Sequence, residues 1–464
     1  MERFYLKFNN LFFWLILGLL VFIPLYPKFP LVNVNGTYVA IRFEDLLIGL
    51  VEGLWLIANF SKLKKIFSMP LTQAFLVFWL IGFISLLSGI FITFTVAPSL
   101  GLFHFLRRIE LMGLFFVAAT AFKNTKQVKL ALQVMLVTAL LVVFYGLGQV
   151  YFKFPVVSTN NSEFSKGLVL VLTLGARPNS TFAGHYDLAI YLSVVLVFLA
   201  SFLFFGKRLL LKIILFITGL LSFGLLGLTA ARASWLASLV GIALVFCVMG
   251  KRILIVGLIL ASTIAVVAIP SLRHRLVATL TVNVLEGGGP KYTPPSPSPI
   301  NKLTASSSAT ATTAAQTNLP IDIAPGEPLN VTELDVYRSY NIRTQVEWPR
   351  AIAAFVKNPL LGTGYSSLTL ATDNDILRSI GETGLLGTLG LSLILFIILK
   401  VLISKLKSKQ GLEQLFIIAT ICSLCAIFIS MIFLDVLEAS KIATLFWILL
   451  GIAWVVANDY QYDK

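Results

Sequence analysis

The sequence predicts an all-α polytopic membrane protein with about twelve transmembrane helices and a large polar segment between the ninth and tenth. Hydrophobic residues make up 58% of the 464 residues, charged residues only 12%, and the mean hydropathy is +0.91, far from a soluble domain's balance. Apolar runs follow one another, each long enough to cross a hydrocarbon core about 30 Å thick. The third observation is the polar stretch from Pro270 to about Glu382 within this apolar sequence.

The apolar runs are continuous rather than alternating, which favours helices because a helix satisfies its own backbone hydrogen bonds in lipid. No cleavable signal is expected, since charged residues precede the first run and no small-residue cleavage site follows it. Three parts are expected: a transmembrane bundle over residues 1–270, a polar segment over 271–383 and transmembrane helices over 384–464. The predicted spans are residues 11–27, 45–60, 71–94, 100–122, 128–152, 187–205, 209–229, 232–250, 253–270, 384–403, 413–434 and 440–457.

Basic residues account for the net charge of +15 and crowd alternate connections between the spans. The connections 95–99 and 435–439 carry no Lys or Arg. By the positive-inside rule, both termini lie in the cytoplasm and the 271–383 segment lies outside. The charge therefore orients the protein, and nucleic-acid binding is not expected. The basic connections contain Lys62, Lys64, Lys65; Lys123, Lys126, Lys129; Lys207, Arg208, Lys212; Lys251, Arg252; and Lys405, Lys407, Lys409.

The polar segment divides into a tether, 286–328, and a helical part, 332–382. The tether is rich in Pro, Ser, Thr and Ala, so it cannot bury enough surface to offset its ordering entropy, which predicts disorder. Thr332 with Asp335 resembles a capping box at a helix start. Pro349 either breaks this helix or begins a second one that ends near Lys357. In the earlier outer loop, 153–186, the run LVLVLTL is β-like.

Five arginines fall on the predicted outer face, where the positive-inside rule would deplete them. Any one alone could be a membrane-surface anchor. Together they favour phosphate binding, because planar guanidinium forks bind phosphate oxygens bidentately. They are Arg177, Arg232, Arg338, Arg343 and Arg378.

A second charged cluster, His104, Arg107, Arg108 and Glu110, lies within the fourth predicted span. Charges at that depth usually face the interior of a bundle and mark a substrate path. The alternative is an internal pair between Arg107 and Glu110, which stand three residues apart on one helix face.

Three segments in order carry a resemblance: RPNSTFAGHYDLAIYL at 177–192, LTAARASWLASLVGIAL at 228–244, and NPLLGTGYSSL with DNDILRSIGETGLLG within 358–387. They resemble the O-antigen ligase and polymerase superfamily of bacterial inner-membrane glycosyltransferases. The resemblance covers roughly residues 170–390 by motif and the rest by topology. It implies a GT-C-like enzyme of the cytoplasmic membrane whose donor is a glycan linked to polyprenyl (undecaprenyl) diphosphate. The implied acceptor is a glycan or a lipid-linked glycan.

The resemblance also implies roles for single residues. Arg177 matches the arginine of the first motif and Arg232 that of the second, both proposed to hold the diphosphate. Arg343 approximates the arginine upstream of the loop tryptophan, here Trp348. We further expect substrate contacts from Arg338, Arg108 and Asn374.

The third motif leaves ligase and polymerase open. Gly362 and Gly364 match its turn glycines. Ligases place a histidine before the asparagine that opens the following helix, and here that position is Asp373, before Asn374. Asp-Asn looks more like polymerases and exopolysaccharide-chain enzymes. Ligases pass the glycan to a lipid-A core sugar, whereas polymerases pass it to another lipid-linked repeat unit.

The expected chemistry is inverting glycosyl transfer without a metal or cofactor. The arginines would neutralise charge on the departing diphosphate, and Asp373 or His185 would take the acceptor proton. Asp373 could instead be the N-cap of its helix. The pair Cys422 and Cys425 lies inside a span with no His nearby and indicates helix packing rather than a metal site.

Two other functions stay open. A transporter or lipid-linked oligosaccharide flippase would share the layout, and should show repeat symmetry and spans broken near the midplane. A non-catalytic scaffold or receptor would have dispensable outer arginines. We expect the glycines Gly381, Gly384 and Gly387 to allow close approach of helix and loop rather than to touch substrate.

Overall fold

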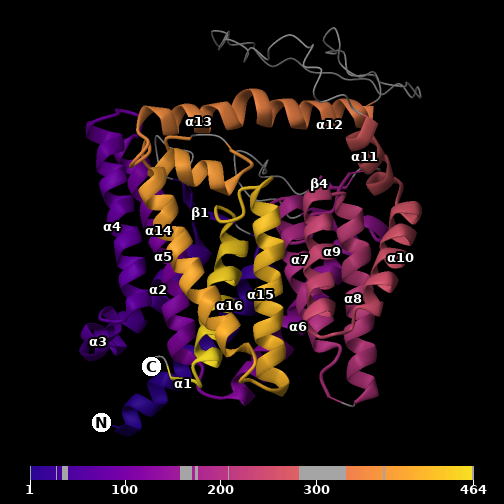
Figure 1. Ribbon diagram of the computed structural model, residues 1–464, viewed down its shortest axis with the longest axis horizontal. Helices are drawn as coiled ribbons and strands as arrows, with labels where there is room; N and C mark the ends of the chain where they lie inside the picture. The colour runs from indigo at the N-terminus through magenta and orange to yellow at the C-terminus, as the bar shows by residue number, and fades with distance from the viewer. Residues whose placement is uncertain are drawn as a thin grey trace.

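The computed structural model describes residues 2–27, 29–33, 40–156, 170–172, 176–206, 208–281, 331–368 and 371–461. The predicted tether and most of the LVLVLTL run lie outside these residues. The described chain is predominantly helical, with long helices standing side by side and α12, η2 and α13 crossing one end of them (Figure 1).

Helices lie at all twelve ranges that the hydropathy pattern predicts. They are α1 (Glu2–Leu25), α2 (Phe43–Ala58), α4 (Pro70–Phe91), α5 (Pro98–Ala121), α6 (Thr125–Tyr151), α7 (His185–Phe202), α8 (Leu209–Thr229), α9 (Arg232–Val248), α10 (Ile253–Ala268), α14 (Asp375–Leu406), α15 (Gly411–Met431) and α16 (Ser440–Ala457).

Shorter elements complete the described chain. They are η1 (Phe60–Lys62), α3 (Leu63–Phe67), α11 (Pro270–Thr281), α12 (Val331–Asn341), the π-helical η2 (Ile342–Glu347), α13 (Trp348–Lys357), and two antiparallel ribbons, β1 (Pro30–Asn33) with β2 (Ala40–Arg42) and β3 (Pro155–Val156) with β4 (Leu170–Val171).

The helices have the length and composition of membrane spans. Among the described residues, seven helices are individually long and apolar enough to cross a membrane, and up to nine if each bent pair counts as one span. The bent pairs are α2 with the η1–α3 segment, at 65°, and α10 with α11, at 100°. The protein is therefore a helical, polytopic membrane protein, as predicted, and the count of twelve spans stays a prediction.

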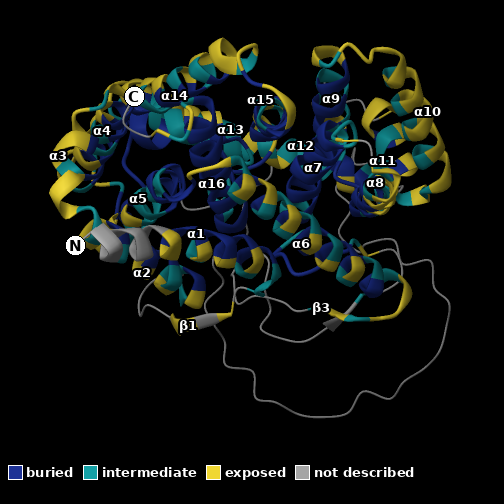
Figure 2. Ribbon diagram, turned by 90° about the horizontal axis from the view of Figure 1, so that it is seen from below, coloured by how far each residue is buried: buried dark blue, intermediate teal, exposed yellow. Residues whose placement is uncertain are grey.

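The centre of the bundle is α16, in which every residue is buried. It packs against α5, and a Cβ at Gly451 would lie 2.4 Å from the Phe115 carbonyl oxygen. Small residues let membrane helices approach this closely. At the edge of the bundle, α10 has no buried residue, and its exposed apolar side chains form an outer surface suited to lipid (Figure 2).

The crossing layer differs in one way from the sequence expectations and decides one alternative that they left open. Helix α12 begins at Val331, so Thr332 lies inside the helix rather than at its N-cap, and Asp335 pairs with Arg275 of α11 at 2.7 Å. Of the two alternatives for Pro349, the structure has the second: Pro349 lies in the first turn of α13, where proline fits, and η2 leads directly into that helix. As predicted, α13 ends at Lys357.

Candidate functional site

The loop before α7 carries Arg177, and hydrogen bonds to three helices hold it in place. Gln149 of α6 accepts from the Ser180 amide at 2.8 Å and donates to the Ser180 carbonyl at 3.1 Å. The Thr181 hydroxyl donates to a carbonyl of α1 at 2.6 Å, and its own carbonyl accepts from the Lys441 ammonium at 2.8 Å. Lys441 lies on α16 and is only 1% exposed. The loop is thus fixed to the core of the bundle.

Arg177 contacts the imidazole that opens α7. Its Nη1 lies 2.7 Å from His185 Nε2. A guanidinium can only donate, so Nε2 must accept and the imidazole proton lies on Nδ1. The other Arg177 nitrogen, Nη2, lies 3.9 Å from the carboxylate of Asp335, which Arg275 approaches more closely.

Arg232 is the first residue of α9, where a left-handed residue at Ala230 turns the chain out of α8. Its guanidinium donates to the Thr279 hydroxyl of α11. It interacts electrostatically with Tyr186, Arg343 and Arg177. Within the described ranges, Arg232 forms no ion pair, so its charge is balanced by no carboxylate there.

Arg343 reaches this site from the π-helical segment η2. It pairs with the Asp373 carboxylate at 2.6 Å and donates to the Ser339 hydroxyl at 2.8 Å. Three buried polar atoms of residues 343–348 have no hydrogen-bond partner among the described residues: Arg343 Nε, Glu347 Oε2 and Trp348 Nε1. Burial and the nearby Asp373 raise the pKa of Glu347 to about 8. Short π-helical segments are frequent at functional sites.

The segment carrying Asp373 is held by the connection between α15 and α16. Asp435 accepts from the Thr372 amide at 2.8 Å and from the Asn374 amide at 3.2 Å. Asp375 accepts from the Val436 amide at 2.7 Å. Asp373 lies between these anchors with φ +47°, a left-handed conformation in which Asp and Asn are enriched. This backbone geometry leaves the Asp373 carboxylate free to reach the arginines.

The capping alternative for Asp373 is wrong. The N-cap of α14 is Asn374, whose side-chain oxygen accepts from the Leu377 amide at 2.9 Å. The Asn374 amide nitrogen donates to the Ile432 carbonyl at 3.0 Å. Asn374, expected to contact substrate, therefore has its side chain committed to the fold. Burial raises the pKa of Asp373, as does Asp435, against the opposing effect of Arg343.

Arg108 belongs to a second charge network. It pairs with Glu438, which also lies 3.8 Å from Arg378, and Arg378 lies 3.6 Å from Asp435. Burial by itself would raise the pKa of Glu438, but Arg108 and Arg378 lower it to about 2. This network supports the connection that holds Asp373. It joins Arg108 and Arg378 to carboxylates of that connection.

The charged cluster on α5 splits between two neighbours. Arg107 lies 3.7 Å from Asp45 of α2, while Arg108 faces Glu438. An ion pair between Arg107 and Glu110 was the alternative from sequence, and the structure gives Arg107 a different carboxylate. Consecutive helical residues point in different directions, which explains the split.

The glycines of the third motif join the 358–364 loop to a break in α14. Gly384 has φ +66° inside the helix. The Thr363 amide donates to the Gly381 carbonyl and the Gly364 amide to the Glu382 carbonyl, both at 2.9 Å. A Cβ on Gly384 would lie 2.4 Å from the Leu360 carbonyl. Close approach of helix and loop, as expected, requires this glycine.

The structure brings five of the predicted residues together. Arg177, His185, Arg232, Arg343 and Asp373 come from four separate stretches of chain, and Arg343 reaches the others from η2 of the crossing layer. Arg338 lies half-buried on α12, in the same layer. We call the set Arg177, Arg232 and Arg343 the arginine cluster.

The sequence reasoning missed the acidic and lysine partners of this site. Asp335, Asp435 and Glu438 each pair with a predicted arginine, and Lys441 fixes the loop of Arg177. The sequence carried a signal for two of these partners, Asp435 and Glu438. The connection 435–439 lacks basic residues but contains Asp435 and Glu438, on the side where the arginines were expected.

Comparison with known proteins adds no relative. No model of a protein family matches the sequence, and no curated protein matches it. In the part of the chain that the structure describes, no group of three His, Cys, Asp or Glu side chains could hold a metal ion. The arginine cluster with Asp373 and His185 is the candidate site.

Proposed function

We propose that the protein is a membrane glycosyltransferase that transfers or polymerises a polyprenyl-diphosphate-linked glycan at the outer face of the bacterial cytoplasmic membrane. The observation that carries the proposal is the arginine cluster. The guanidinium group of Arg232 lies within electrostatic range of Arg177 and Arg343, which come from distant parts of the chain, although like charges repel. An anionic ligand bound between these guanidinium groups would offset their repulsion.

The charge balance of the cluster favours a ligand with more than one negative charge. Arg343 is compensated by Asp373, and Arg177 shares Asp335 with Arg275. Arg232 has no carboxylate partner in the described chain. A diphosphate offers several oxygens to forked donors, and such charge-assisted hydrogen bonds are roughly twice as strong as neutral ones.

The proposed reaction is a direct displacement at the anomeric carbon. The acceptor hydroxyl oxygen bonds to that carbon while the bond from the carbon to the diphosphate oxygen breaks. The electron pair leaves with the diphosphate, whose developing charge the arginine cluster stabilises. The hydroxyl proton passes to a base of the site.

Two residues are placed to be that base. His185 Nε2 accepts from Arg177, and Asp373 accepts from Arg343. Both bases are therefore held by arginines of the cluster. If Arg177 and Arg343 turn toward a bound diphosphate, each gives up its hydrogen bond to the base. His185 or Asp373 then has a free lone pair that can accept the proton of the acceptor hydroxyl. Ligase and polymerase chemistry use the same step and differ in the acceptor.

The alternative is a transporter or flippase, and the break in α14 bears on it. Transporters use broken spans to expose backbone groups to substrate. At Gly384 the neighbouring backbone groups are instead hydrogen-bonded to the 358–364 loop. This arrangement favours an anchored loop beside the candidate site over a substrate passage.

The test uses purified protein in nanodiscs with a synthetic polyprenyl-diphosphate glycan. We expect release of polyprenyl diphosphate together with a longer lipid-linked glycan, or with a glycan joined to a non-diphosphate acceptor. The first product indicates a polymerase and the second a ligase. In sealed vesicles, movement of the intact lipid-linked glycan across the membrane without diphosphate release would refute the proposal in favour of a flippase.

A further inference from the structure

An apolar cavity lies at the end of the bundle opposite the arginine cluster. Helix α7 begins at His185 beside the cluster, and the cavity is lined by its last turns, from Val195 onward. The cavity holds about 690 Å³ of space free of protein atoms, including its open mouth.

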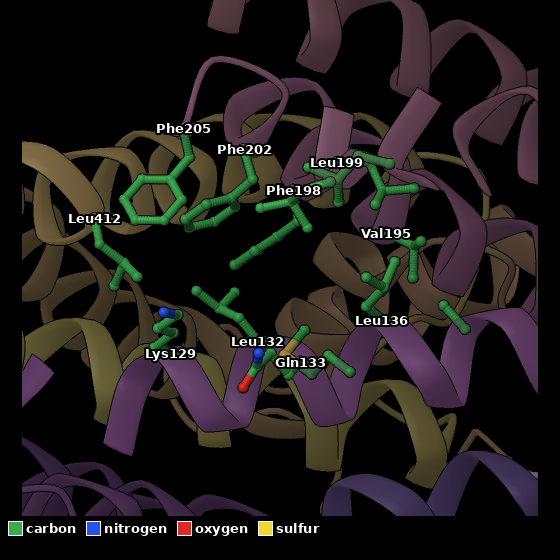
Figure 3. A pocket seen from close by; sticks show the side chains of 14 residues that line it. Lys129, Leu132, Gln133, Leu136, Val195, Phe198, Leu199, Phe202, Phe205 and Leu412 are labelled. Atoms are coloured by element: carbon green, nitrogen blue, oxygen red, sulfur yellow. The ribbon is translucent and has the colours of Figure 1, made fainter. Parts of the chain in front are cut away.

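The cavity occupies the space between α6 and α7. Helix α6 packs on α1 and α8, while α7 packs on α8, α9 and α15. Phe198 and Phe202 of α7 face Leu132 and Leu136 of α6 across the opening (Figure 3). Leu211 and Leu215 of α8 and Leu412 of α15 complete the lining. The described lining is hydrocarbon except along one turn of α6.

The polar side chains of the lining are Lys129 and Gln133, one helical turn apart on α6. Lys129 is exposed, lies one turn into α6, and forms no ion pair within the described ranges. No acidic residue is among the described residues that line the cavity. Lys126 and Arg208 stand near the ends of α6 and α8 at this same end of the bundle. A hydrocarbon pocket with a cation at its rim matches an amphiphile with an apolar chain and an anionic head.

We propose that this cavity binds an anionic phospholipid of the leaflet at that end, with one acyl chain between α6 and α7 and its phosphate at Lys129. A membrane protein meets such lipids at high local concentration. Lys and Arg near the membrane surface favour anionic head groups over zwitterionic ones. This inference depends on membrane embedding and on the cavity, and is independent of the glycosyltransferase proposal.

Native mass spectrometry of the full-length protein tests the site. After delipidation and titration with phosphatidylglycerol, the wild type should retain one lipid at a concentration where phosphatidylcholine is largely lost. Ala139→Phe places a ring in the cavity from α6 and should remove this retained lipid. Leu141→Phe is the matched control, because Leu141 is 47% exposed on the same helix and does not line the cavity.

The head-group contact is tested separately. Lys129→Gln should lower the preference for phosphatidylglycerol over phosphatidylcholine by about fivefold, the effect of one basic residue at a membrane surface. Lys126→Gln, on the same helix but outside the cavity lining, should change it less. Leu136→Trp is a second cavity-filling variant, and a melting temperature near that of the wild type shows that a filled variant is folded.

Three results would overturn the inference. Equal retention of phosphatidylglycerol by wild type and both folded cavity-filling variants would place the lipid elsewhere. Equal wild-type affinity for the two phospholipids would remove the role of Lys129. Displacement of phosphatidylglycerol by stoichiometric polyprenyl phosphate would make the cavity a site for the substrate's tail.

Discussion

Replacing Arg232 is the sharpest test of the arginine cluster, because this arginine has no carboxylate partner in the described chain. Its guanidinium contacts a hydroxyl, Thr279, and interacts with two other arginines. If it holds a diphosphate, Arg232→Ala removes a hydrogen bond to a charged group, worth about 1.5–3 kcal/mol. Turnover should then fall by about ten- to 150-fold for one bond, and by more for two.

Arg232→Lys separates charge from geometry. Lysine keeps the positive charge but loses the planar fork that binds two phosphate oxygens. We expect turnover between those of the wild type and Arg232→Ala. A membrane-surface anchor would accept lysine without kinetic change.

The assay is transfer from a synthetic polyprenyl-diphosphate glycan by purified variants in nanodiscs, at equal protein levels. Arg273→Ala is the matched control, because Arg273 is an exposed arginine of α11, close in sequence to Thr279. Melting temperatures without substrate distinguish a lost ligand contact from a damaged fold. Removing Arg232 also removes its repulsion with Arg177 and Arg343, so the melting temperature should stay level or rise. Wild-type turnover of Arg232→Ala, or an equal loss in Arg273→Ala, would refute the diphosphate role.

Four further outcomes are expected. Asp373→Asn suits the left-handed backbone and should melt near the wild type while transfer falls about 10²- to 10⁴-fold; unchanged turnover would remove Asp373 as the base. The pKa of Glu347 is raised to about 8 in the folded protein, against an ordinary 4.5. Its neutral carboxyl therefore contributes to stability at low pH, and this contribution is lost as the pH rises from about 4.5 to 8. Glu347→Gln should therefore melt above the wild type at pH 8.5 but not at pH 4.5, and parallel pH curves would contradict this. Lys441→Met leaves the carbonyl at the Arg177 loop without its donor, so amide exchange over residues 178–184 should accelerate; unchanged exchange would mean that other bonds hold the loop. In a background without native cysteines, Gln345→Cys should react with an impermeant thiol reagent on intact cells and Lys407→Cys should not; the reverse would invert the proposed orientation.

Local sequence features predicted the helices well. Continuous hydrophobicity over about twenty residues has few structural solutions in a membrane, and a helix lies at each predicted range. Boundaries were less certain, as the capping of α14 shows. Both Asp and Asn are good N-caps, so the pattern Asp373-Asn374 did not say which residue caps. The left-handed backbone at Asp373 decided it.

The sequence by itself determined the membrane class and marked the arginines, because hydropathy and charge placement are local properties of the chain. Only the tertiary structure decided which charges meet. Asp335 reaches Arg275 and Arg177, Glu438 reaches Arg108, and Lys441 reaches the Thr181 carbonyl, across 60 to 330 residues of sequence. Such pairs depend on how the helices pack in three dimensions. A buried charge needs a partner, but the chain order does not say which helix will supply it.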